Sequence, residues 1–510
     1  MITGKNFIGN DLSANGNIVY KTINPKLNSE NAWECTEATS DEINSAAELA
    51  WKAFKEFRKT SQTARADFLN AIADEIEALG DELIATYCLE SGLPEGRANG
   101  EKGRTMFQLR TFAEMLKTDT WKLTSHDAAN LDRTPIPMQD LRKSVIPLGP
   151  VAVFGSSNFP LAYSTAGGDT ASAFAAGCPV IVKSHPMHAG TGELVASAII
   201  KAAKKTNMPN GVFSNLNSKG IEVGVQLVKH PKVKAVGFTG SIKAGRALYD
   251  IANARPEPIP MFAEMGSINP VVITQNALEV KGTQWAETYA GSVTLGTGQF
   301  CTNPGLILGI DSPELDAFAA HMARKIVEID PMCMLHPNIK AAYSTIKSEV
   351  TSQEGVQVLS ATVDAENNFA DHAVAVVDGT HFLSNPNLHK EVFGPFSIIM
   401  KCEDQAQLLE IIEGLEGQLT GTILAEDTDI DSLAEVVDEL QQRVGRIIFN
   451  GVPTGVEVCP SMNHGGPYPA STDSRYTAVG TDSVKRWVRL ISYQSFPNEL
   501  LPSELKNGTI

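Results

Sequence analysis

Short apolar segments alternate with helical segments along most of this chain, and this alternation restricts the fold more than any other feature. Residues 151–154, 179–183 and 233–238 form apolar runs, and helix-forming stretches lie between them at about 164–176 and 190–205. Short buried strands separated by helices are typical of a parallel sheet covered on both faces. We therefore expect a doubly wound α/β sheet in this part of the chain.

A second series of the same kind begins after about residue 262. Its apolar runs lie at residues 270–273, 305–309, 420–424 and 446–450. A chain of 510 residues is too long for one hydrophobic core, so two or three domains are expected. The sequence thus predicts two α/β domains, and amphipathic helices at 40–120 are assigned to the first.

Two segments fit neither series. Residues 125–140 are polar and contain Pro135 and Pro137, which indicates an extended excursion. Residues 487–493 alternate apolar and polar side chains, as a half-buried strand does. The predicted boundaries are 1–127 with 148–262 for the first domain, 263–482 for the second, and 128–147 with 483–510 for an extended arm and tail.

Charge and cysteine usage narrow the functional class. The formal net charge of −17 argues against a nucleic-acid or anionic-membrane partner, because phosphate binding needs a basic face. The negative net charge does not exclude a small anionic substrate, because one buried arginine could bind it. No window is apolar enough for a membrane span, and the first residues lack a signal-peptide pattern, so a cytoplasmic location is expected. Seven cysteines without a C-x-x-C pair predict reduced thiols and no metal site.

Two candidate catalytic side chains stand in unusual local settings. Cys301 lies in a polar, glycine-flanked segment, where an exposed thiolate would be a good nucleophile, although most free cysteines are small buried hydrophobes. Glu264 stands between apolar residues, where a carboxyl group with a raised pKa could act as a general base. More often such a carboxylate is solvated or paired. The sequence around Cys301 or Glu264 alone therefore does not distinguish a catalytic role from a structural one.

Two further clusters follow the ends of predicted strands. Asn158 lies just past residues 151–154, and its amide could donate to an oxyanion or only form a turn. Gly240, Ser241 and Gly245 form a turn that opens a helix, where backbone N–H groups can bind a phosphate. This turn is not the G-x-G-x-x-G fingerprint, so these residues alone leave nucleotide binding open.

Taken together, the clusters resemble the aldehyde dehydrogenase superfamily over nearly the whole chain, in the family's order and at about its spacing. The resemblance implies that Cys301 is the nucleophile that forms a thioester, Glu264 the general base and Asn158 an oxyanion donor. It implies an NAD or NADP cofactor, a dinucleotide-binding first domain, a catalytic second domain and an oligomerisation arm that builds a homodimer or homotetramer. The residues implied to hold the cofactor are Lys183, Ser184, Gly240, Ser241, Gly245, Glu391 and Phe393.

Several positions depart from the common family pattern. Ser156 and Ser157 precede Asn158 where the family commonly has Pro-Trp, and Pro186 stands where it commonly has an acid. An acid there would repel a 2′-phosphate, so we expect NADP to be accepted. These departures and the C-terminal stretch 450–467 resemble the 2-oxoglutarate semialdehyde dehydrogenase branch, with NADP-linked fatty aldehyde dehydrogenases as close neighbours.

The expected substrate is a small aldehyde, with 2-oxoglutarate semialdehyde favoured over a long-chain fatty aldehyde. By resemblance, Arg104 falls on the helix that lines the aldehyde tunnel, and its guanidinium would suit a carboxylate; it could equally be exposed or paired with Glu101. Phe159, Phe300 and His464 are the other candidates for the substrate site. The alternatives are a thiol acyl transferase or esterase without hydride transfer, and a catalytically idle structural protein.

Overall fold

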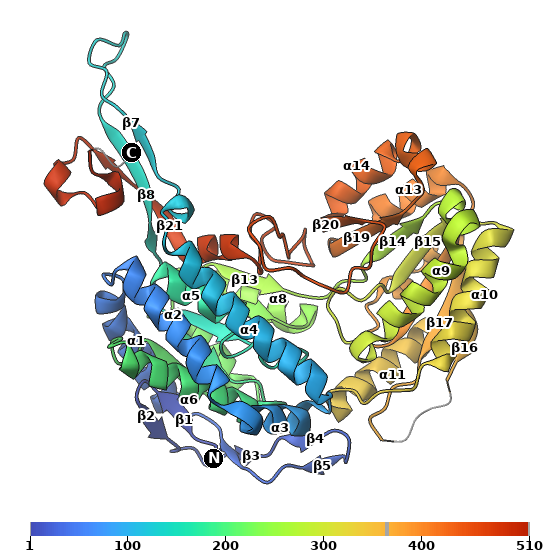
Figure 1. The fold of residues 1–510 in the computed structure, drawn as a ribbon, viewed down its shortest axis with the longest axis horizontal. Helices are drawn as coiled ribbons and strands as arrows, with labels where there is room; N and C mark the ends of the chain where they lie inside the picture. Colours follow the sequence, from blue (N-terminus) through green and yellow to red (C-terminus); the bar gives the residue numbers. More distant parts are fainter. Residues whose placement is uncertain (1, 363–366, 508–510) are drawn as a thin grey trace.

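The computed structural model of the chain describes residues 2–362 and 367–507. These residues form two seven-stranded sheets, a three-stranded sheet and two short two-stranded ribbons. In Figure 1 the two large sheets lie in separate halves of the molecule, and the three-stranded sheet projects away from the first half. The predicted fold class, two doubly wound α/β domains with a β-strand arm, is confirmed.

The first large sheet has the strand order β13-β12-β9-β10-β11-β1-β2. Its five parallel strands are short and mostly buried, as expected where helices cover both faces. They are β9 (Val151–Phe154), β10 (Val180–Lys183), β11 (Phe213–Leu216), β12 (Ala235–Thr239) and β13 (Met261–Glu264). The sheet ends in two antiparallel strands, β1 (Asn6–Ile8) and the edge strand β2 (Asp11–Ser13). Neither was predicted, because three residues carry little periodic signal.

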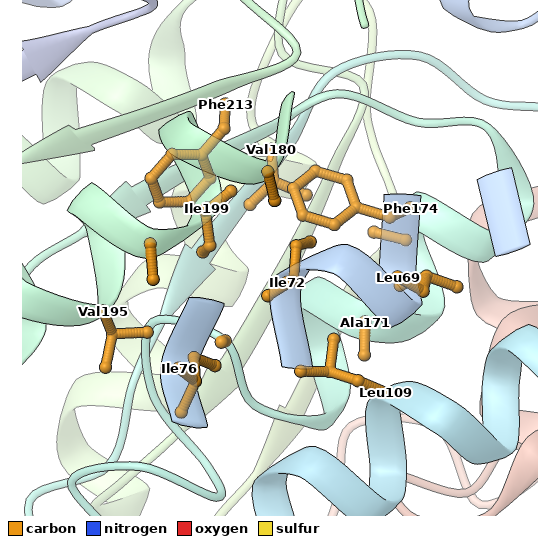
Figure 2. Packing of buried hydrophobic residues seen from close by; sticks show 14 of the residues in the cluster. Leu69, Ile72, Ile76, Leu109, Ala171, Phe174, Val180, Val195, Ile199 and Phe213 are labelled. Carbon is orange, nitrogen blue, oxygen red and sulfur yellow. The ribbon is translucent and has the colours of Figure 1, made fainter. Parts of the chain in front are cut away.

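Helices cover both faces of this sheet. Figure 2 shows the packing on one face, where Leu69 and Ile72 of a helix meet Phe174 of another and Val180 of the sheet. This face carries α2 (Gln62–Glu77), α3 (Gly80–Ser91), α4 (Glu95–Met115), α5 (Gly168–Ala176) and α6 (Ala189–Lys205). The other face carries α1 (Ser40–Phe57), α7 (Glu222–Lys229) and α8 (Ile242–Asn253).

The second large sheet has the order β16-β17-β18-β15-β14-β19-β20, with only β16 (Gln357–Ala361) antiparallel. Its parallel strands are β14 (Pro270–Ile273), β15 (Leu306–Ile310), β17 (Ala373–Asp378), β18 (Phe396–Cys402), β19 (Gln418–Leu424) and β20 (Val444–Phe449). One face packs against α9 (Gln275–Thr294) and α10 (Pro313–Glu328). The other packs against α11 (Pro337–Thr351), α12 (Gly379–Ser384), α13 (Gln405–Gly414) and α14 (Ala434–Arg443). Within the described ranges, no helix is long and apolar enough to cross a membrane.

The arm is an antiparallel sheet that joins two distant parts of the sequence. β21 (Val488–Gln494) pairs with β8 (Leu141–Pro147), which pairs with β7 (Ser125–Asp127). Leu131, Ile136 and Leu490 of this region are more than half exposed. The two ribbons near the N-terminus are β3 (Val19–Tyr20) with β6 (Cys35–Thr36), and β4 (Ile23–Asn24) with β5 (Ser29–Glu30).

The structure shifts the predicted domain boundaries. The division at 262/263 falls inside β13, and the arm begins with β7, before residue 128. Residues after about 465, which we assigned to the second domain as far as 482, return to the first: the Thr472 N–H donates to the Ala263 carbonyl oxygen of β13 at 3.1 Å. In the segment assigned to the arm and tail, Trp487 is buried in the core of the first domain and donates to Ser172 Oγ at 2.7 Å. The last three residues of the predicted tail, 508–510, lie outside the described ranges. These boundaries depend on which strands pair across the chain, which local sequence does not encode.

Candidate active site

The two large sheets present opposite strand ends to a common cavity of about 340 Å³. The segments after the carboxyl ends of β9, β12 and β13 line it from one side, and the segments before the amino ends of β15 and β18 line it from the other. Six predicted site residues are among the lining residues: Asn158, Gly240, Ser241, Cys301, Glu391 and Phe393. The fold thus brings four distant sequence segments to one place.

The position of the cavity follows from the winding of the first sheet. From β9, the chain continues through β10 and β11 to one side, and then through β12 and β13 on the other. Ligands of doubly wound sheets bind outside the carboxyl ends of the strands at such a switch point. Asn158 follows β9 and Gly240 follows β12, so both lie at this point.

Cys301, Glu264 and His464 form a cluster beside the cavity. His464 Nε2 lies 3.6 Å from Cys301 Sγ and 2.9 Å from Glu264 Oε1. Glu264 and His464 are only 4% and 1% exposed, so water screens these charges little. A thiol, a carboxylate and an imidazole at these distances can exchange protons.

The electrostatics of the cluster favour a resting thiol. Burial, followed by the negative charge of Glu264 and then of Glu391, raises the pKa of Cys301 well above its ordinary value. Both carboxylate oxygens of Glu264 are buried and lack a hydrogen bond in the described structure, because the close contact with His464 is not aligned as one. A base must therefore accept the thiol proton when the nucleophile forms, and His464 Nε2 lies 3.6 Å from the sulfur.

Asn158 is held beside the nucleophile by its own amide. Its Nδ2 donates to the carbonyl oxygen of Gln299, two residues before Cys301, at 3.0 Å. An Asn amide has two N–H donors, so this bond leaves a second donor for an oxyanion. The loop that carries Asn158 is fixed at its start, where His188 Nε2 lies 2.9 Å from the Ser156 carbonyl oxygen.

Asn269 positions the Cys301 loop, and sequence analysis assigned it no role. Its Nδ2 donates to the carbonyl oxygens of Cys301 and Asn303, both at 2.9 Å. Its backbone has φ 52°, in the left-handed region that Asn tolerates better than most residues. Gln418 Oε1 accepts from the Ile268 N–H at 2.7 Å and so fixes the same turn. An Asn before a strand is common in turns, so the sequence had no signal that distinguishes this one.

Three aromatic rings form a wall between Cys301 and α4. Phe159 and Phe300 pack edge to face with ring centroids 5.4 Å apart. Tyr163 lies 5.0 Å from Phe159 and 6.2 Å from the His464 ring. The substrate candidates Phe159, Phe300 and His464 therefore belong to one contiguous surface.

Arg104 reaches this wall from α4. Its Nη2 donates to the Tyr163 hydroxyl at 3.3 Å, and its Nη1 donates to the Val456 carbonyl oxygen. Arg104 is half-buried, and Glu101 pairs with Arg97 instead. Arg104 is therefore neither fully exposed nor paired with Glu101, the two alternatives that the sequence left open. Part of its hydrogen-bonding capacity holds the loop around Val456, while its Nε is buried without a partner in the described structure.

Arg97 is a site residue that sequence analysis missed. Its guanidinium carbon lies 4.4 Å from the Phe159 ring centroid and 4.8 Å from that of Phe300. Its Nε pairs with Glu101 at 3.5 Å. The available signal was helical spacing, because Arg97 precedes Arg104 by about two turns and so lies on the same face of α4.

Arg446 is a third cation near the nucleophile and was also missed. Burial lowers its pKa, while negative charge at Cys301 and Tyr163 acts in the opposite direction. Arg446 Nη1 and Nη2 donate to the carbonyl oxygens of Gly455 and Pro453 at 2.8 and 2.9 Å. Arg446 and Arg104 therefore hold the same loop from two sides. The sequence around β20 gives no signal that distinguishes Arg446 from an arginine exposed to solvent.

The cofactor candidates Gly240, Ser241 and Gly245 form the close junction between β12 and α8. Ser241 begins α8, and its side chain accepts the Ala244 N–H at 3.3 Å. A Cβ at Gly245 would lie 2.6 Å from Met265 Sδ, and a Cβ at Gly240 would lie 2.7 Å from the Phe238 ring. Only glycine allows this approach, which brings the α8 N-terminus to the cavity.

Glu391 and Phe393 face this junction across the cavity. Burial raises the pKa of Glu391 to about 7, although a hydrogen bond from the Ser267 backbone opposes the shift. A Cβ at Gly266 would lie 2.6 Å from Glu391 Oε2. The carboxyl group is thus pressed against the glycine turn that follows Glu264.

Lys183 ends β10 and Ser184 follows it, and neither is among the residues that line the cavity beside Cys301. Burial lowers the pKa of Lys183 to about 8, against the effect of Glu37. Ser184 Oγ is buried without a hydrogen-bond partner in the described structure. A second cavity of about 580 Å³ shares Asn338 with the first and is lined by Pro186, Met187, Lys21 and Lys219 among others. The cleft therefore continues from Cys301 past the end of β10.

Comparison with known proteins decides the family. Residues 12–471 match the model of the aldehyde dehydrogenase family. This chain belongs to the aldehyde dehydrogenase family. The family and the enzyme class predicted from the sequence are confirmed.

Individual relatives agree with this assignment. The chain is 48% identical over 472 residues to alpha-ketoglutaric semialdehyde dehydrogenase 2 of Azospirillum brasilense, covering 92% of this chain and 90% of the relative. It is 43% identical over 507 residues to the alpha-ketoglutaric semialdehyde dehydrogenase of Acinetobacter baylyi, covering 99% and 96%. A betaine aldehyde dehydrogenase of Staphylococcus aureus, solved in complex with NAD+, superposes with a TM-score of 0.83 at 19% identity, covering 98% of each chain. That last likeness shows a shared fold.

Proposed function

We propose that this aldehyde dehydrogenase oxidises 2-oxoglutarate semialdehyde to 2-oxoglutarate with NAD(P), through a thioester on Cys301. The observation that carries the proposal is the meeting of a thiol, a carboxylate and an imidazole beside a glycine-lined cavity. The two bacterial relatives named for the semialdehyde activity support the substrate. A thiol acyl transferase or esterase would leave the cavity at the α8 N-terminus without a use.

The residues divide the chemistry between two steps. Cys301 sulfur adds to the aldehyde carbon as His464 Nε2 accepts the thiol proton, and the Asn158 amide with the Cys301 backbone N–H stabilises the oxyanion. When bound, the nicotinamide ring supplies the acceptor for the hydride that leaves this carbon. Glu264 then takes a proton from water, whose oxygen attacks the thioester carbon. Departure of the thiolate releases the carboxylate, and the thiolate regains its proton.

The residues around the cavity fit a dinucleotide. The α8 N-terminus can receive a phosphate, and the glycines at 240 and 245 keep this approach open. Lys183 and Ser184 at the end of β10 supply further donors, and Ser184 Oγ is buried without a hydrogen-bond partner in the described structure; Glu391 with Phe393 would flank the nicotinamide end. Pro186 lines the second cavity, so no acid at position 186 repels a 2′-phosphate. Lys219 and Lys21 line the same cavity, where Lys21 pairs with Glu30 and Glu34 at 3.7 and 3.9 Å. These features support use of NADP as well as NAD.

Arginines at the aromatic wall support an anionic substrate. Arg97, Arg104 and Arg446 give a positive local field in a chain of net charge −17. The Nε of Arg97 pairs with Glu101 and its guanidinium lies over the Phe159 and Phe300 rings, so we expect this group to meet a carboxylate at the wall. A fatty aldehyde would instead need an apolar surface here.

Substitution on α4 tests the substrate. Arg97→Leu and Arg104→Leu are assayed with 2-oxoglutarate semialdehyde and with a neutral alkanal of similar length, using both cofactors. Loss of a carboxylate contact worth about 1.5–3 kcal/mol should raise KM for the anion alone by roughly 10- to 100-fold. Arg110→Leu is the matched control, because Arg110 lies on the same helix but pairs with Asp74 at 2.9 Å. Equal losses for both aldehydes would show that the arginines hold the loop and do not select the substrate.

We also propose that the arm assembles the chain into a homodimer or homotetramer. β21 leaves one edge of the arm sheet unpaired in the described structure, and Leu131, Ile136 and Leu490 are exposed nearby. Exposed apolar side chains beside a free strand edge favour pairing with a second copy. Sedimentation at micromolar concentration tests this, and a monomer mass would contradict it. The expected location remains the cytoplasm, in keeping with seven free cysteines in the described residues.

A further inference from the structure

The catalytic cluster has the composition of a zinc site as well as that of a thiol enzyme. Its possible ligand atoms are Cys301 Sγ, His464 Nε2 and one carboxylate oxygen of Glu264, and all three lie within 4.8 Å of one another. Zinc is bound in proteins by thiolate, imidazole and carboxylate, with bonds of about 2.0–2.3 Å. Tetrahedral geometry with such bonds places ligand atoms about 3.3–3.6 Å apart. The Cys301 to His464 distance is 3.6 Å, so this pair is already spaced as two zinc ligands.

A second observation concerns the Glu264 carboxylate, whose close neighbour is His464 Nε2 at 2.9 Å. Both oxygens of Glu264 are buried without a hydrogen bond in the described structure, and so is His464 Nδ1. A buried carboxylate without an aligned hydrogen bond is costly unless a cation meets it. One Zn²⁺ with two anionic ligands gives a neutral complex, which would remove this cost.

We infer that Glu264, Cys301 and His464 form a three-ligand site for Zn²⁺ that reversibly blocks the nucleophile. The thiol loses its proton to solvent as the Zn–S bond forms, and no electron is transferred. Three protein ligands leave a fourth position for water, on the side where Cys301 lines the cavity. The cavity also gives the ion a path to the site. Soft thiolate and imidazole ligands favour zinc over magnesium or calcium.

The sequence did not predict this site, and we expected no metal. Zinc sites are recognised in sequences by closely spaced Cys and His residues, whereas Cys301 and His464 are 163 residues apart in the sequence. Only the packing of the C-terminal loop against β13 brings them together. The inference concerns inhibition and goes beyond the proposed oxidation.

Direct binding of Zn²⁺ to the purified full-length chain tests the inference. After treatment with a chelator and its removal, competition with a chromophoric zinc indicator should show one tight site per chain. His464→Gln and Cys301→Ser should each weaken this site by about 100-fold or more, whereas Cys459→Ser and Cys88→Ser, which change the other partly exposed thiols, should not. Thermal melts verify that each variant is folded. Wild-type affinity in His464→Gln, or loss of the site in Cys459→Ser, would overturn the inference.

A second measurement does not depend on folding of variants. Stoichiometric Zn²⁺ should slow alkylation of Cys301 by iodoacetamide and stop NAD(P)H formation, and EDTA should restore both. Cobalt in place of zinc should give a thiolate-to-metal absorption band. Alkylation at an unchanged rate in saturating zinc would refute the site, whatever the substrate proves to be. Failure of the semialdehyde assay with an intact zinc site would refute only the proposed function.

Discussion

The two large sheets contribute to the active site from opposite ends of their strands. In the first sheet, Asn158, Gly240 and Glu264 lie at or just after the carboxyl ends of β9, β12 and β13. In the second sheet, Cys301 and Glu391 lie before the amino ends of β15 and β18. The first arrangement follows the general rule for doubly wound sheets, and the second does not.

This difference shows how each half is held. At the carboxyl ends, strand-to-helix turns and their glycines fix the backbone, and the bound group meets a helix N-terminus. At the amino ends, side chains fix the loops that precede the strands. Asn269 and Gln418 form this network. Gln418 Oε1 accepts from the Ile268 N–H in the turn before β14 at 2.7 Å, Asn269 Nδ2 donates to the Cys301 carbonyl oxygen at 2.9 Å, and Asn269 Oδ1 accepts from Thr420 Oγ1 of β19 at 3.0 Å. The amino-end half should therefore be sensitive to loss of polar side chains, and the carboxyl-end half to added bulk.

The largest effect is expected at the nucleophile on the amino-end side. Cys301→Ala removes the sulfur that lies 3.6 Å from His464 Nε2, so turnover should fall by about 10⁴-fold or more. Steady-state NAD(P)H formation measures this, with Cys459→Ser as the control. Wild-type turnover in Cys301→Ala would end the proposed mechanism and remove the basis of the comparison.

The next largest effect is expected at the anchor of the Cys301 loop. Asn269→Ala loses the donor to two carbonyl oxygens and should lower kcat by about 10²-fold, because small misplacement of a reacting group is costly. Asn207→Ala is the matched control, since Asn207 also has a positive φ of 55° but is exposed at the end of α6. The alkylation rate of Cys301 should fall only in Asn269→Ala. Equal kinetics in the two variants would mean that backbone strain, and not the side-chain network, explains any loss.

A smaller effect is expected from bulk at the carboxyl-end side. Gly245→Ala places a Cβ 2.6 Å from Met265 Sδ, and overpacking of about 1–3 kcal/mol should displace the α8 N-terminus. KM for NADP should rise by roughly tenfold with little change in KM for the aldehyde. Gly282→Ala, in open space on α9, provides the control. A rise confined to the aldehyde KM would show that this turn does not serve the cofactor.

The smallest effect is a pH dependence of stability at Glu391. Its pKa is about 7 in the folded chain and near 4.3 when unfolded, so the folded state binds the extra proton between these values. Stability associated with the neutral carboxyl group is complete below about pH 4 and is lost as the pH rises through 7. Glu391→Gln should therefore melt at a higher temperature than the wild type at pH 8, with the difference shrinking toward pH 4. Parallel melting curves across this range would contradict the assigned pKa.

Much of the first half was predictable because its signals are local. The apolar runs at β9, β10 and β12, the glycines at 240 and 245 and the position of Asn158 just after a strand are all visible within short windows. Each depends on backbone conformation or strand burial that neighbouring residues determine. Four strands of the second sheet were predicted. β16, β17 and β18 were not predicted, because the sequence between residues 310 and 420 showed no clear alternation of apolar strands and helices.

The sequence by itself determined the two α/β series, the glycine turn and the chemical identity of the thiol, carboxylate and amide. Tertiary structure alone decided that His464 contacts both Glu264 and Cys301, that Arg97 stacks on two aromatic rings, and that residues after about 465 return to the first domain. Local segments encode backbone conformation through propensity and periodicity. Contacts between segments far apart in sequence depend on which strand ends the packed sheets bring together, and no short window contains that information.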